Sequence, residues 1–276
     1  MSVLRCRQLV RMGDPDKYAA IMMAPSIYRE KLFPLYAFNC EIGRIVYGSK
    51  DPAISEIKLN WWKEELFNGY STDSPVGHEI MDPLLRTINS EKVPVELFLK
   101  ILEARRFDLY NCHHKSLDDQ VKYIRNIFSS LFEISLRTCV SSTDENALDC
   151  IRDYGFSYGV ANLFTAVGKL EQLGRKPIYL GSQSELRNDF GYNRSAEYQG
   201  GIRNLADLAI TSLMKARSKL SNCDSSIVSL IYFVAPTNKI LKYVRHNPEL
   251  VITGKARPSF LYTRISLEIA RLRKFL

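Results

Sequence analysis

The chain has 276 residues, of which 46% are hydrophobic and 25% charged, enough for a sizeable core and ordinary for a soluble protein. Its net charge of +8 favours anionic partners such as nucleic acid, an acidic membrane surface or a diphosphate, and the alternative is a basic surface without a specific partner. The Lys and Arg residues form no long block and match no nucleic-acid-binding motif, so we expect no nucleic-acid partner.

The N-terminal sequence and the cysteine pattern indicate the cellular compartment of the protein. Residues 1–9 lack the long apolar stretch of a signal peptide, and no run approaches the ~18–20 apolar residues that span a bilayer. The six cysteines form no C-x-x-C pair, which is typical of reduced thiols. We therefore expect a cytoplasmic protein whose membrane association, if present, is peripheral.

Apolar residues recur at helical spacing along the first half of the chain. The segment Ser26–Val46 predicts a helix that Pro34 should kink or divide. A second helix is expected over Pro52–Phe67, with Pro at its first position, and Gly69 should end it. A third is expected from Pro94 to about Asn111.

The second half has the same character. We expect helices over Asp118–Cys139 and Asp144–Lys169, and then a connection at Gly174–Gly191 with a short extended piece at residues 178–180. Glycines inside the second of these helices cost roughly 1 kcal/mol each relative to alanine, a cost usually offset by close helix packing or by space for a ligand. The remaining expected helices are Asn204–Leu220, Ser225–Val244 and Ser259–Phe275. The pattern predicts an all-α protein with a single domain over residues 1–276.

One segment carries a specific resemblance. Residues 35–47, LYAFNCEIGRIVY, resemble the first signature of the squalene/phytoene synthase family. Catalytic members carry two aspartates at i and i+4 where this chain has Gly43 and Tyr47. Two aspartates at that spacing point the same way on a helix, one turn apart.

The second signature shows the same change. Residues 158–167, YGVANLFTAV, resemble it, but the asparagine position is Ala166 and the aspartate positions are Leu170 and Gly174. The ending survives as Pro-Ile-Tyr-Leu at 177–180, preceded by Arg175 and Lys176. Two further segments, 57–66 and 104–110, are similar to family helices, the latter from a branch that looks non-enzymatic. The resemblance is strongest over residues 15–215.

The resemblance implies an isoprenoid-synthase-type helical bundle. In catalytic members Mg²⁺ bridges two prenyl diphosphates to the paired aspartates, and an apolar cavity shields the carbocation. Because all four aspartates are absent here, we expect no metal ligands and no cofactor; Mg²⁺ would be the cofactor only of an active synthase.

No other carboxylate set replaces the missing one. Asp149 and Asp153 have the i, i+4 spacing but begin twenty-one residues before Leu170, about 31 Å along the same expected helix. The neighbours in Glu64-Glu65 and in Asp118-Asp119 point in different directions on a helix. The triplet Cys112-His113-His114 lacks the spacing of a structural zinc site.

Six residues are candidates for binding a ligand. Each also has a structural interpretation: the aromatic residues as core or cavity wall, the Glu and the first Arg as an i, i+3 ion pair, and both Arg residues as surface charges. The candidates are Tyr36, Glu41, Arg44, Trp62, Arg175 and Tyr179.

Three functions remain open. The first is a non-catalytic binding or assembly factor, since the chain resembles the branch that contains the mitochondrial respiratory complex I assembly factor; a respiratory-complex protein would be its partner. The second is an active phytoene or squalene synthase that uses unrecognised ligands. The third is a lipid- or quinone-binding protein, with an isoprenoid or lipid in an apolar cavity. Fold alone does not decide among them.

Overall fold

Helices form all the regular structure in the part of the chain that the computed structural model describes, residues 3–49, 51–72, 75–110, 113–141, 143–179, 196–220 and 232–273. The first half contains α1 (Leu4–Gly13), α2 (Pro15–Met23), α3 (Ser26–Gly48), α4 (Pro52–Gly69), α5 (Met81–Ser90), α6 (Val95–Phe107) and the 3₁₀ turn η1 (Asp108–Tyr110). The second contains α7 (Leu117–Ile124), the π turn η2 (Arg125–Ser129), α8 (Ser130–Cys139), α9 (Glu145–Gln172), α10 (Ala196–Leu220), η5 (Tyr232–Val234), α12 (Thr237–His246), α13 (Glu249–Ile252) and α14 (Phe260–Arg273). This confirms the all-α expectation.

Side-chain caps fix several helix starts. Asp14, Asp51, Ser116 and Asp144 each accept a hydrogen bond from a backbone N–H in the first turn of α2, α4, α7 and α9 respectively. Such a bond satisfies one of the donors that a helix start leaves without a partner. The starts of these helices are therefore encoded locally.

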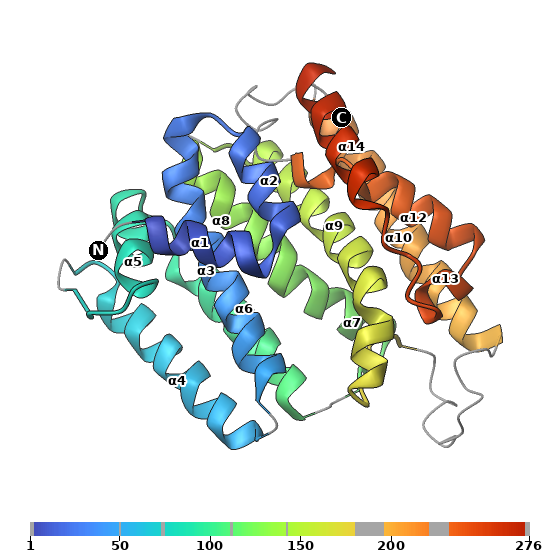
Figure 1. Ribbon diagram of the computed structural model, residues 1–276, viewed down its shortest axis with the longest axis horizontal. Coiled ribbons are helices and arrows are strands. Elements are labelled where there is room, and N and C mark those ends of the chain that lie inside the picture. Colours follow the sequence, from blue (N-terminus) through green and yellow to red (C-terminus); the bar gives the residue numbers. More distant parts are fainter. Residues whose placement is uncertain are drawn as a thin grey trace.

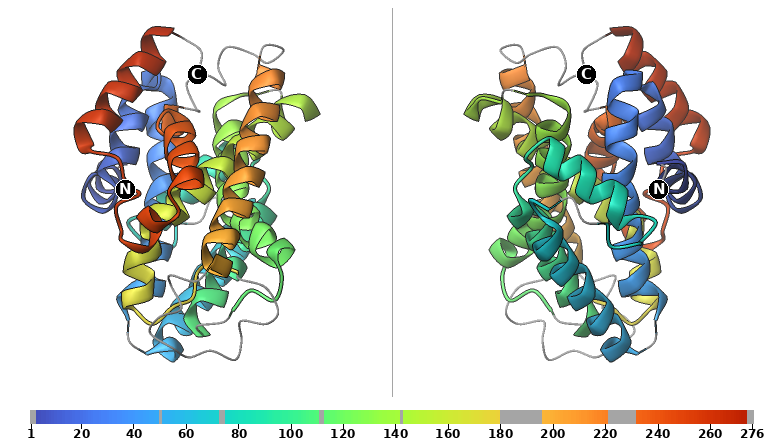
Figure 2. Two further views of the ribbon diagram at one scale, coloured as in Figure 1. Left: turned by 90° about the vertical axis from the view of Figure 1, so that its right-hand side faces the viewer. Right: turned by 90° about the vertical axis from the view of Figure 1, so that its left-hand side faces the viewer.

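Helix α9 lies between the two sides of the bundle. Figure 1 shows α4 and α5 on one side of it and α10, α12, α13 and α14 on the other. It packs against α8, α10 and η2, and α10 lies beside α12 in Figures 1 and 2. One cluster of buried apolar residues runs from Cys6 in α1 to Ala270 in α14.

Two helices differ from the sequence expectation. Helix α3 is continuous across Pro34, which lies buried inside it, so of the two expected effects, a kink or a division, the division does not occur. The helix expected over residues 118–139 is α7, η2 and α8 in succession, because the chain passes through a π turn at Arg125–Ser129. A π turn inserts one residue into the helical repeat and is often found at functional sites.

Glycines explain how α9 approaches this π turn. A Cβ on Gly159 would lie 2.6 Å from the Phe128 ring and 2.7 Å from Ile124, and one on Gly155 would lie 2.7 Å from the Phe128 carbonyl oxygen. Only glycine permits such an approach without a shift of the neighbouring atoms. Close helix packing therefore accounts for both glycines.

The remaining differences concern boundaries. Helix α6 ends at Phe107, and α1, α2, α5 and α13 are additional to the helices expected from the sequence. Residues 225–231 of one expected helix, and residues 180–191 of the expected connection, lie outside the described part of the chain, as do Cys112 and Cys223. The thiols of Cys6, Cys40, Cys139 and Cys150 are free. None of the described helices is both long and apolar enough to cross a membrane.

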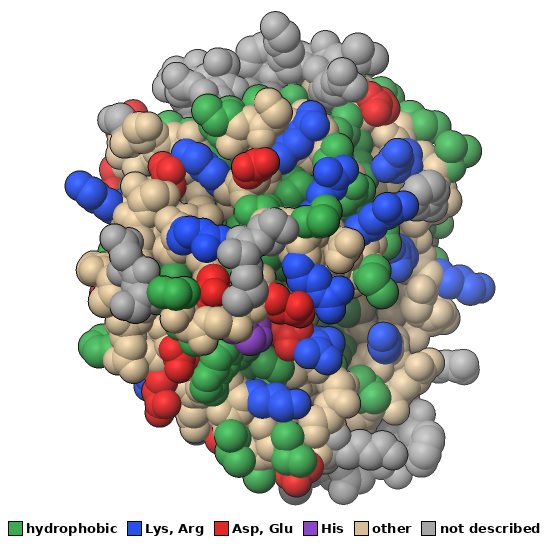
Figure 3. Space-filling model, turned by 60° about the vertical axis from the view of Figure 1, so that its left-hand side comes forward, with side chains coloured by type: hydrophobic (Ala, Val, Ile, Leu, Met, Phe, Trp, Pro, Cys, Tyr) green, Lys and Arg blue, Asp and Glu red, His purple; other side chains and the backbone are tan. Residues whose placement is uncertain are grey.

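Charges of both signs share the surface. On the face drawn in Figure 3, Lys and Arg side chains lie among Asp and Glu side chains and exposed hydrophobic ones. Ion pairs of 2.7 to 3.0 Å join Lys31 to Glu91 and Arg5 to Glu79. Ion pairs at the surface contribute at most about 1 kcal/mol each.

Candidate functional site

A partly buried carboxylate lies where the C-terminal ends of α3 and α6 meet α7. Asp108, the first residue of η1, accepts hydrogen bonds at Oδ2 from the Tyr47 phenol (2.8 Å) and from Nη1 of Arg105 (3.3 Å). The Tyr123 phenol donates to both carboxylate oxygens, at 2.9 and 2.8 Å. Nη1 of Arg105 also donates to the Tyr47 oxygen, at 3.0 Å. Three side chains therefore share one carboxylate.

Burial and these contacts set the protonation states. Burial raises the pKa of Tyr47 to about 12 and that of Tyr123 well above its usual value, so both phenols stay neutral donors at pH 7. Burial disfavours the charged form of Arg105, but Tyr47, Tyr123 and Asp108 outweigh it and raise the Arg105 pKa. The arrangement is an Arg–Asp ion pair held by two tyrosines.

The connection after α9 closes over this ion pair. Arg175 donates a short hydrogen bond from Nη1 to the backbone oxygen of Asp108. The guanidinium carbon of Arg175 lies 4.8 Å from the centroid of the Tyr47 ring, within range of a cation–π contact. Two residues from separate family-like signatures, Tyr47 and Arg175, thus meet in space.

A cavity of about 230 Å³ borders these residues, and we call it the Tyr47 pocket. Its apolar wall includes Phe107, Ile124, Phe128, Leu163, Leu170 and Leu173. Its charged lining consists of Arg105, Lys169, Arg175, Lys176 and Asp108. His114 also lines it, and burial lowers the pKa of this imidazole to about 4, so it is neutral at pH 7.

The four lost aspartate positions are not equivalent. Tyr47 and Leu170 both line the pocket, from α3 and α9 respectively. Gly43 lies one turn earlier on α3, with open space where its Cβ would be. Gly174 lies beyond the end of α9 at φ +74°, and the N–H of Arg175 donates to the Leu170 carbonyl at 3.0 Å. That pattern is a Schellman motif, so position 174 is not on the helix.

The six candidate ligand-binding residues are spread over several places. Arg175 borders the Tyr47 pocket. Tyr36 lies in the core, where its oxygen accepts a 3.3 Å hydrogen bond from Ser135, and Trp62 packs edge-on to Phe38 at 5.4 Å.

The other three candidates have their own contacts. Arg44 is exposed and pairs with Glu41 on α3 at 2.6 Å, as the i, i+3 spacing predicts. The backbone N–H of Tyr179 donates to the Gln120 side chain at 3.2 Å. None of these three appears in the lining of the Tyr47 pocket among the residues that are described.

Sequence reasoning missed Asp108, Tyr123, His114 and Lys169 as site residues. Asp108 and Arg105 occur within the family-like segment 104–110, but nothing in their spacing distinguishes an inward carboxylate from a helix-end ion pair. The sequence marks Tyr47 only as a position where an aspartate is missing. Its phenol contacts the Asp108 carboxylate only in the folded chain, so residue spacing does not indicate the contact.

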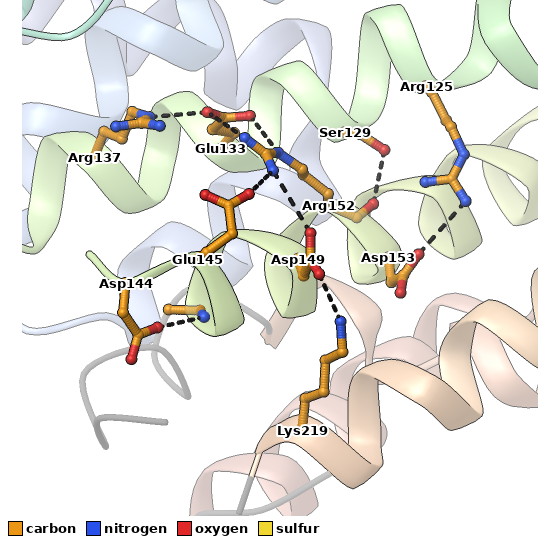
Figure 4. Close-up of polar contacts among 11 residues, drawn as sticks. Arg125, Ser129, Glu133, Arg137, Asp144, Glu145, Asp149, Arg152, Asp153 and Lys219 are labelled. Atoms are coloured by element: carbon orange, nitrogen blue, oxygen red, sulfur yellow. Dashed lines mark hydrogen bonds and ion pairs between the residues drawn. The ribbon is translucent and has the colours of Figure 1, made fainter. Parts of the chain in front are cut away.

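Two acidic residues in the N-terminal half of α9 form ion pairs with basic side chains outside the Tyr47 pocket. Figure 4 shows Asp149 directed toward Lys219 of α10, at 2.8 Å, and Asp153 toward Arg125, at 3.5 Å. Ser212 also donates to Asp153 at 2.7 Å. Both carboxylates are thus held by side chains of other elements, and neither lines the Tyr47 pocket.

The donor set of the Tyr47 pocket does not suit Mg²⁺. The ion prefers octahedral oxygen ligands supplied by carboxylates, phosphates and water. Among the described lining residues only Asp108 is acidic, and it already accepts from three side chains. No cluster of three or more His, Cys, Asp or Glu side chains suited to a metal ion occurs in the described ranges.

A second cavity of about 80 Å³ adjoins α9 on its α2 side. Lys17, Tyr158, Thr237 and Arg257 line it, and Asn162 lines both cavities. Lys17 is buried and pairs with Asp14 at 2.8 Å. Its Nζ lies 5.9 Å from the Tyr158 ring centroid.

One family model matches most of the chain. The profile described as squalene/phytoene synthase matches residues 10–264. A crystal structure of a dehydrosqualene synthase with a ligand superposes with a TM-score of 0.80 and 15% identity, covering 98% of this chain and 95% of that one. The crystal structure of squalene synthase HpnC from Alicyclobacillus acidocaldarius superposes with a TM-score of 0.74 and 20% identity, covering 90% of this chain and 94% of that one. At these identities the likeness establishes the fold.

Curated relatives carry a different kind of name. The Dictyostelium discoideum homolog of NADH dehydrogenase (ubiquinone) complex I assembly factor 6 is 23% identical over 218 residues, 78% of this chain and 57% of that protein. The Drosophila melanogaster homolog is 26% identical over 167 residues, which are 59% of this chain and 49% of that protein. The Homo sapiens protein is 23% identical over 131 residues, which are 48% of this chain and 39% of that protein. The chain thus spans about half the length of the curated relatives it matches.

Proposed function

The chain belongs to the squalene/phytoene synthase family, and we propose that it is a non-catalytic member that acts as a binding or assembly factor. The observation that carries this proposal is the hydrogen bond from Tyr47 to Asp108. Catalytic members have an aspartate at the position of Tyr47. In this chain the Tyr47 phenol takes that position, and the Arg105–Asp108 ion pair lies beside it.

The chemistry of condensation depends on charge neutralisation. Active members of the family depend on Mg²⁺, which offsets the negative charge that develops on departing diphosphate. In the Tyr47 pocket Asp108 is already bound to Tyr47, Tyr123 and Arg105. A pocket of about 230 Å³ is also below the ~300–1,000 Å³ typical of ligand sites and small for two prenyl chains. We therefore assign the protein no cofactor.

The proposed partner is a respiratory-complex protein. The support is the name shared by the relatives from Dictyostelium, Drosophila and human, which are complex I assembly factors or their homologs. The matched region extends over most of the bundle in the first of these. An assembly factor needs a stable scaffold and a binding surface rather than a reaction centre.

One assay separates this proposal from an active synthase. Purified protein is incubated with farnesyl or geranylgeranyl diphosphate and Mg²⁺, and the extract is analysed for head-to-head products. We expect none. A condensation product that disappears on addition of EDTA would overturn the non-catalytic assignment. Affinity purification should enrich complex I subunits with the wild-type chain, and their absence would count against the assembly role.

Lipid binding is a second candidate, favoured by the apolar wall of the Tyr47 pocket. Phe107, Phe128 and Leu170 offer it a surface without hydrogen-bonding groups. An isoprenoid, another lipid or a quinone co-purifying with the protein, detected by mass spectrometry, would support this role. Binding of such a ligand is compatible with an assembly function.

We also propose peripheral membrane contact through α14 for a protein that is otherwise cytoplasmic. Residues 237–276 contain nine Lys or Arg and two Glu, a net +7 of the chain's +8. On α14 the side chains of Leu261, Ile265 and Ile269 are 67%, 48% and 44% exposed and follow one another at i, i+4 and i+8. An apolar stripe among basic residues is suited to an anionic lipid surface.

A further inference from the structure

A third cavity, of about 480 Å³, lies between α12 and the start of α14, and we call it the Lys255 pocket. Three cationic side chains line it: Lys239 from α12, and Lys255 and Arg257 from the connection between α13 and α14. Its described lining includes no Asp or Glu, and shares no residue with the Tyr47 pocket. A cavity with this excess of positive charge favours an anion.

Two of these cations have no carboxylate partner in the described part of the chain, namely Lys239 and Lys255. The Nζ of Lys239 lies 3.7 Å from the centroid of the Tyr262 ring, a cation–π contact that joins α12 to α14. An ammonium group has three N–H donors, so a contact with one ring leaves donors for a ligand. Arg257 pairs with Asp16 at 3.0 Å, but its side chain is exposed. The three cations are therefore available to an anion from solution or from a surface.

The surroundings of the pocket favour an anion that belongs to a lipid surface. Tyr243 and Tyr262 line the pocket, and a tyrosine has an apolar body and a polar tip, which suits the boundary between lipid and water. The exposed side chains of Ile265 and Ile269 follow Tyr262 at i+3 and i+7, so they lie on the same side of α14. A free anion would gain nothing from this apolar stripe. A phospholipid has its phosphate directly above its acyl chains, which matches a cationic pocket beside an apolar helix face.

We propose that the Lys255 pocket binds the phosphate of an anionic phospholipid through Lys239, Lys255 and Arg257, while the apolar stripe of α14 lies on the bilayer. The proposal rests on the peripheral membrane contact proposed above and adds a fixed head-group site to it. Charge-assisted hydrogen bonds from lysine and arginine to the phosphate supply the specific contact. General attraction between a basic surface and anionic lipid would instead depend little on which basic residue is present.

The test compares single lysine replacements in the full chain. Binding is titrated with vesicles of phosphatidylcholine and phosphatidylglycerol in equal parts. Lys242→Met is the matched control, because Lys242 is exposed on the same helix as Lys239 and does not line the pocket. We expect Lys242→Met to weaken binding by up to about fivefold, the effect of one basic residue near an anionic surface. Lys239→Met and Lys255→Met should each weaken it by at least about thirtyfold, because each also removes a direct contact with the phosphate.

Folding and the source of the phosphate need separate measurements. Lys255 is exposed and has no ion pair among the described residues, so its replacement should leave the urea midpoint unchanged even if loss of the Lys239–Tyr262 contact lowers it. Inorganic phosphate, titrated by calorimetry, tests a free anion. It should bind at least about tenfold more weakly than the vesicles per accessible phosphate, because it buries no apolar surface.

Two results would overturn the pocket alone. Equal losses in Lys242→Met and in both pocket variants would leave only general attraction to the anionic surface. Inorganic phosphate that binds as tightly as the vesicles would assign the pocket to a free anion. Failure of the wild-type chain to bind anionic vesicles at all would overturn the membrane contact together with the pocket, so the two failures are distinguishable. The non-catalytic assignment is tested separately, by the condensation assay.

Discussion

The Tyr47 phenol donates a 2.8 Å hydrogen bond to Oδ2 of Asp108, a residue 61 positions later in the chain. The bond ties the C-terminal end of α3 to η1, directly after α6. It also brings a neutral donor to a position where catalytic relatives have an acid. The same contact therefore contributes to stability and changes the chemistry of the pocket.

Removing that phenol should cost stability. We expect Tyr47→Phe to lower the free energy of unfolding by about 1.5 kcal/mol, because it leaves the partly buried carboxylate of Asp108 with one donor fewer. Chemical denaturation at pH 7 measures the change. Tyr110→Phe is the control: that phenol is 56% exposed and donates to Glu56, so the change should stay within about 0.5 kcal/mol. Equal losses in the two variants would contradict a special role for the Tyr47 contact.

Two of the lost aspartate positions should respond in opposite directions to alanine. Gly43 is helical and a Cβ there meets nothing within 4 Å, so Gly43→Ala should raise the unfolding free energy by about 0.5–1 kcal/mol. Gly174 has φ +74°, so Gly174→Ala should lower it by about 1 kcal/mol. Thermal and urea unfolding of both variants measure the difference. The same sign for both would be inconsistent with the left-handed end of α9.

The close approach of α9 to the π turn predicts a third effect. Gly159→Ala would place a methyl group 2.6 Å from the Phe128 ring, and we expect a loss of about 1–3 kcal/mol. Gly200→Ala, in helix α10, is the control because its Cβ meets nothing within 4 Å. If urea midpoints show Gly159→Ala to be as stable as Gly200→Ala, the packing described for α9 and η2 is incorrect.

The Glu133 carboxylate predicts an acid dependence of stability. Burial alone would raise its pKa, but hydrogen bonds from Arg152 and Arg137 outweigh burial and lower it from the usual 4.5. Because the folded pKa is the lower one, the contribution is complete above about pH 4.5 and is lost as the pH falls through the folded pKa.

The matching experiment compares variants across pH. Glu133→Gln should unfold at lower urea concentration than the wild type at pH 7, and this gap should close toward pH 3. Glu145→Gln serves as the control, since Glu145 is 73% exposed and binds only Arg152 among the partners drawn in Figure 4. Its effect should be small at every pH. A gap that is constant with pH would exclude an ionic contribution from Glu133.

The apolar stripe on α14 predicts vesicle binding. Flotation should show the protein on vesicles that contain phosphatidylglycerol, less on neutral phosphatidylcholine, and less at high salt because salt screens the basic residues. Ile265→Asp should weaken binding roughly tenfold through lost apolar burial. Met214 is 66% exposed on α10, and Met214→Asp should leave vesicle binding unchanged. Equal binding to neutral and anionic vesicles would contradict the charge-based proposal.

Local signals in the sequence predicted much of the fold. The apolar spacing of α3 and α9 and the proline at the start of α4 correspond to helices with nearly those bounds. The π turn was not predictable, because a single extra residue in a helical repeat leaves no mark in the apolar pattern at that scale. The sequence also left open whether Pro34 kinks or divides its helix, and α3 is not divided there.

The site was less accessible to sequence reasoning. The positions of the lost aspartates come from the family pattern, and two of them, Tyr47 and Leu170, do line one pocket. What replaces the aspartates depends on Asp108 and Tyr123, which come from other helices. Contacts across such separations are set by the packing of the bundle, so residue spacing within one segment could not reveal them.

The shared carboxylate of Asp108 also limits which substitutions position 47 tolerates. Replacing Tyr47 alone by aspartate would remove a donor from Asp108 and place a second anion against it, close to Arg105. Such an intermediate would lose stability before any metal site existed, because paired carboxylates repel one another until a cation joins them. Recovery of a metal site would need several substitutions at once. The Tyr47–Asp108 contact therefore makes a metal site at this position unreachable by a single substitution.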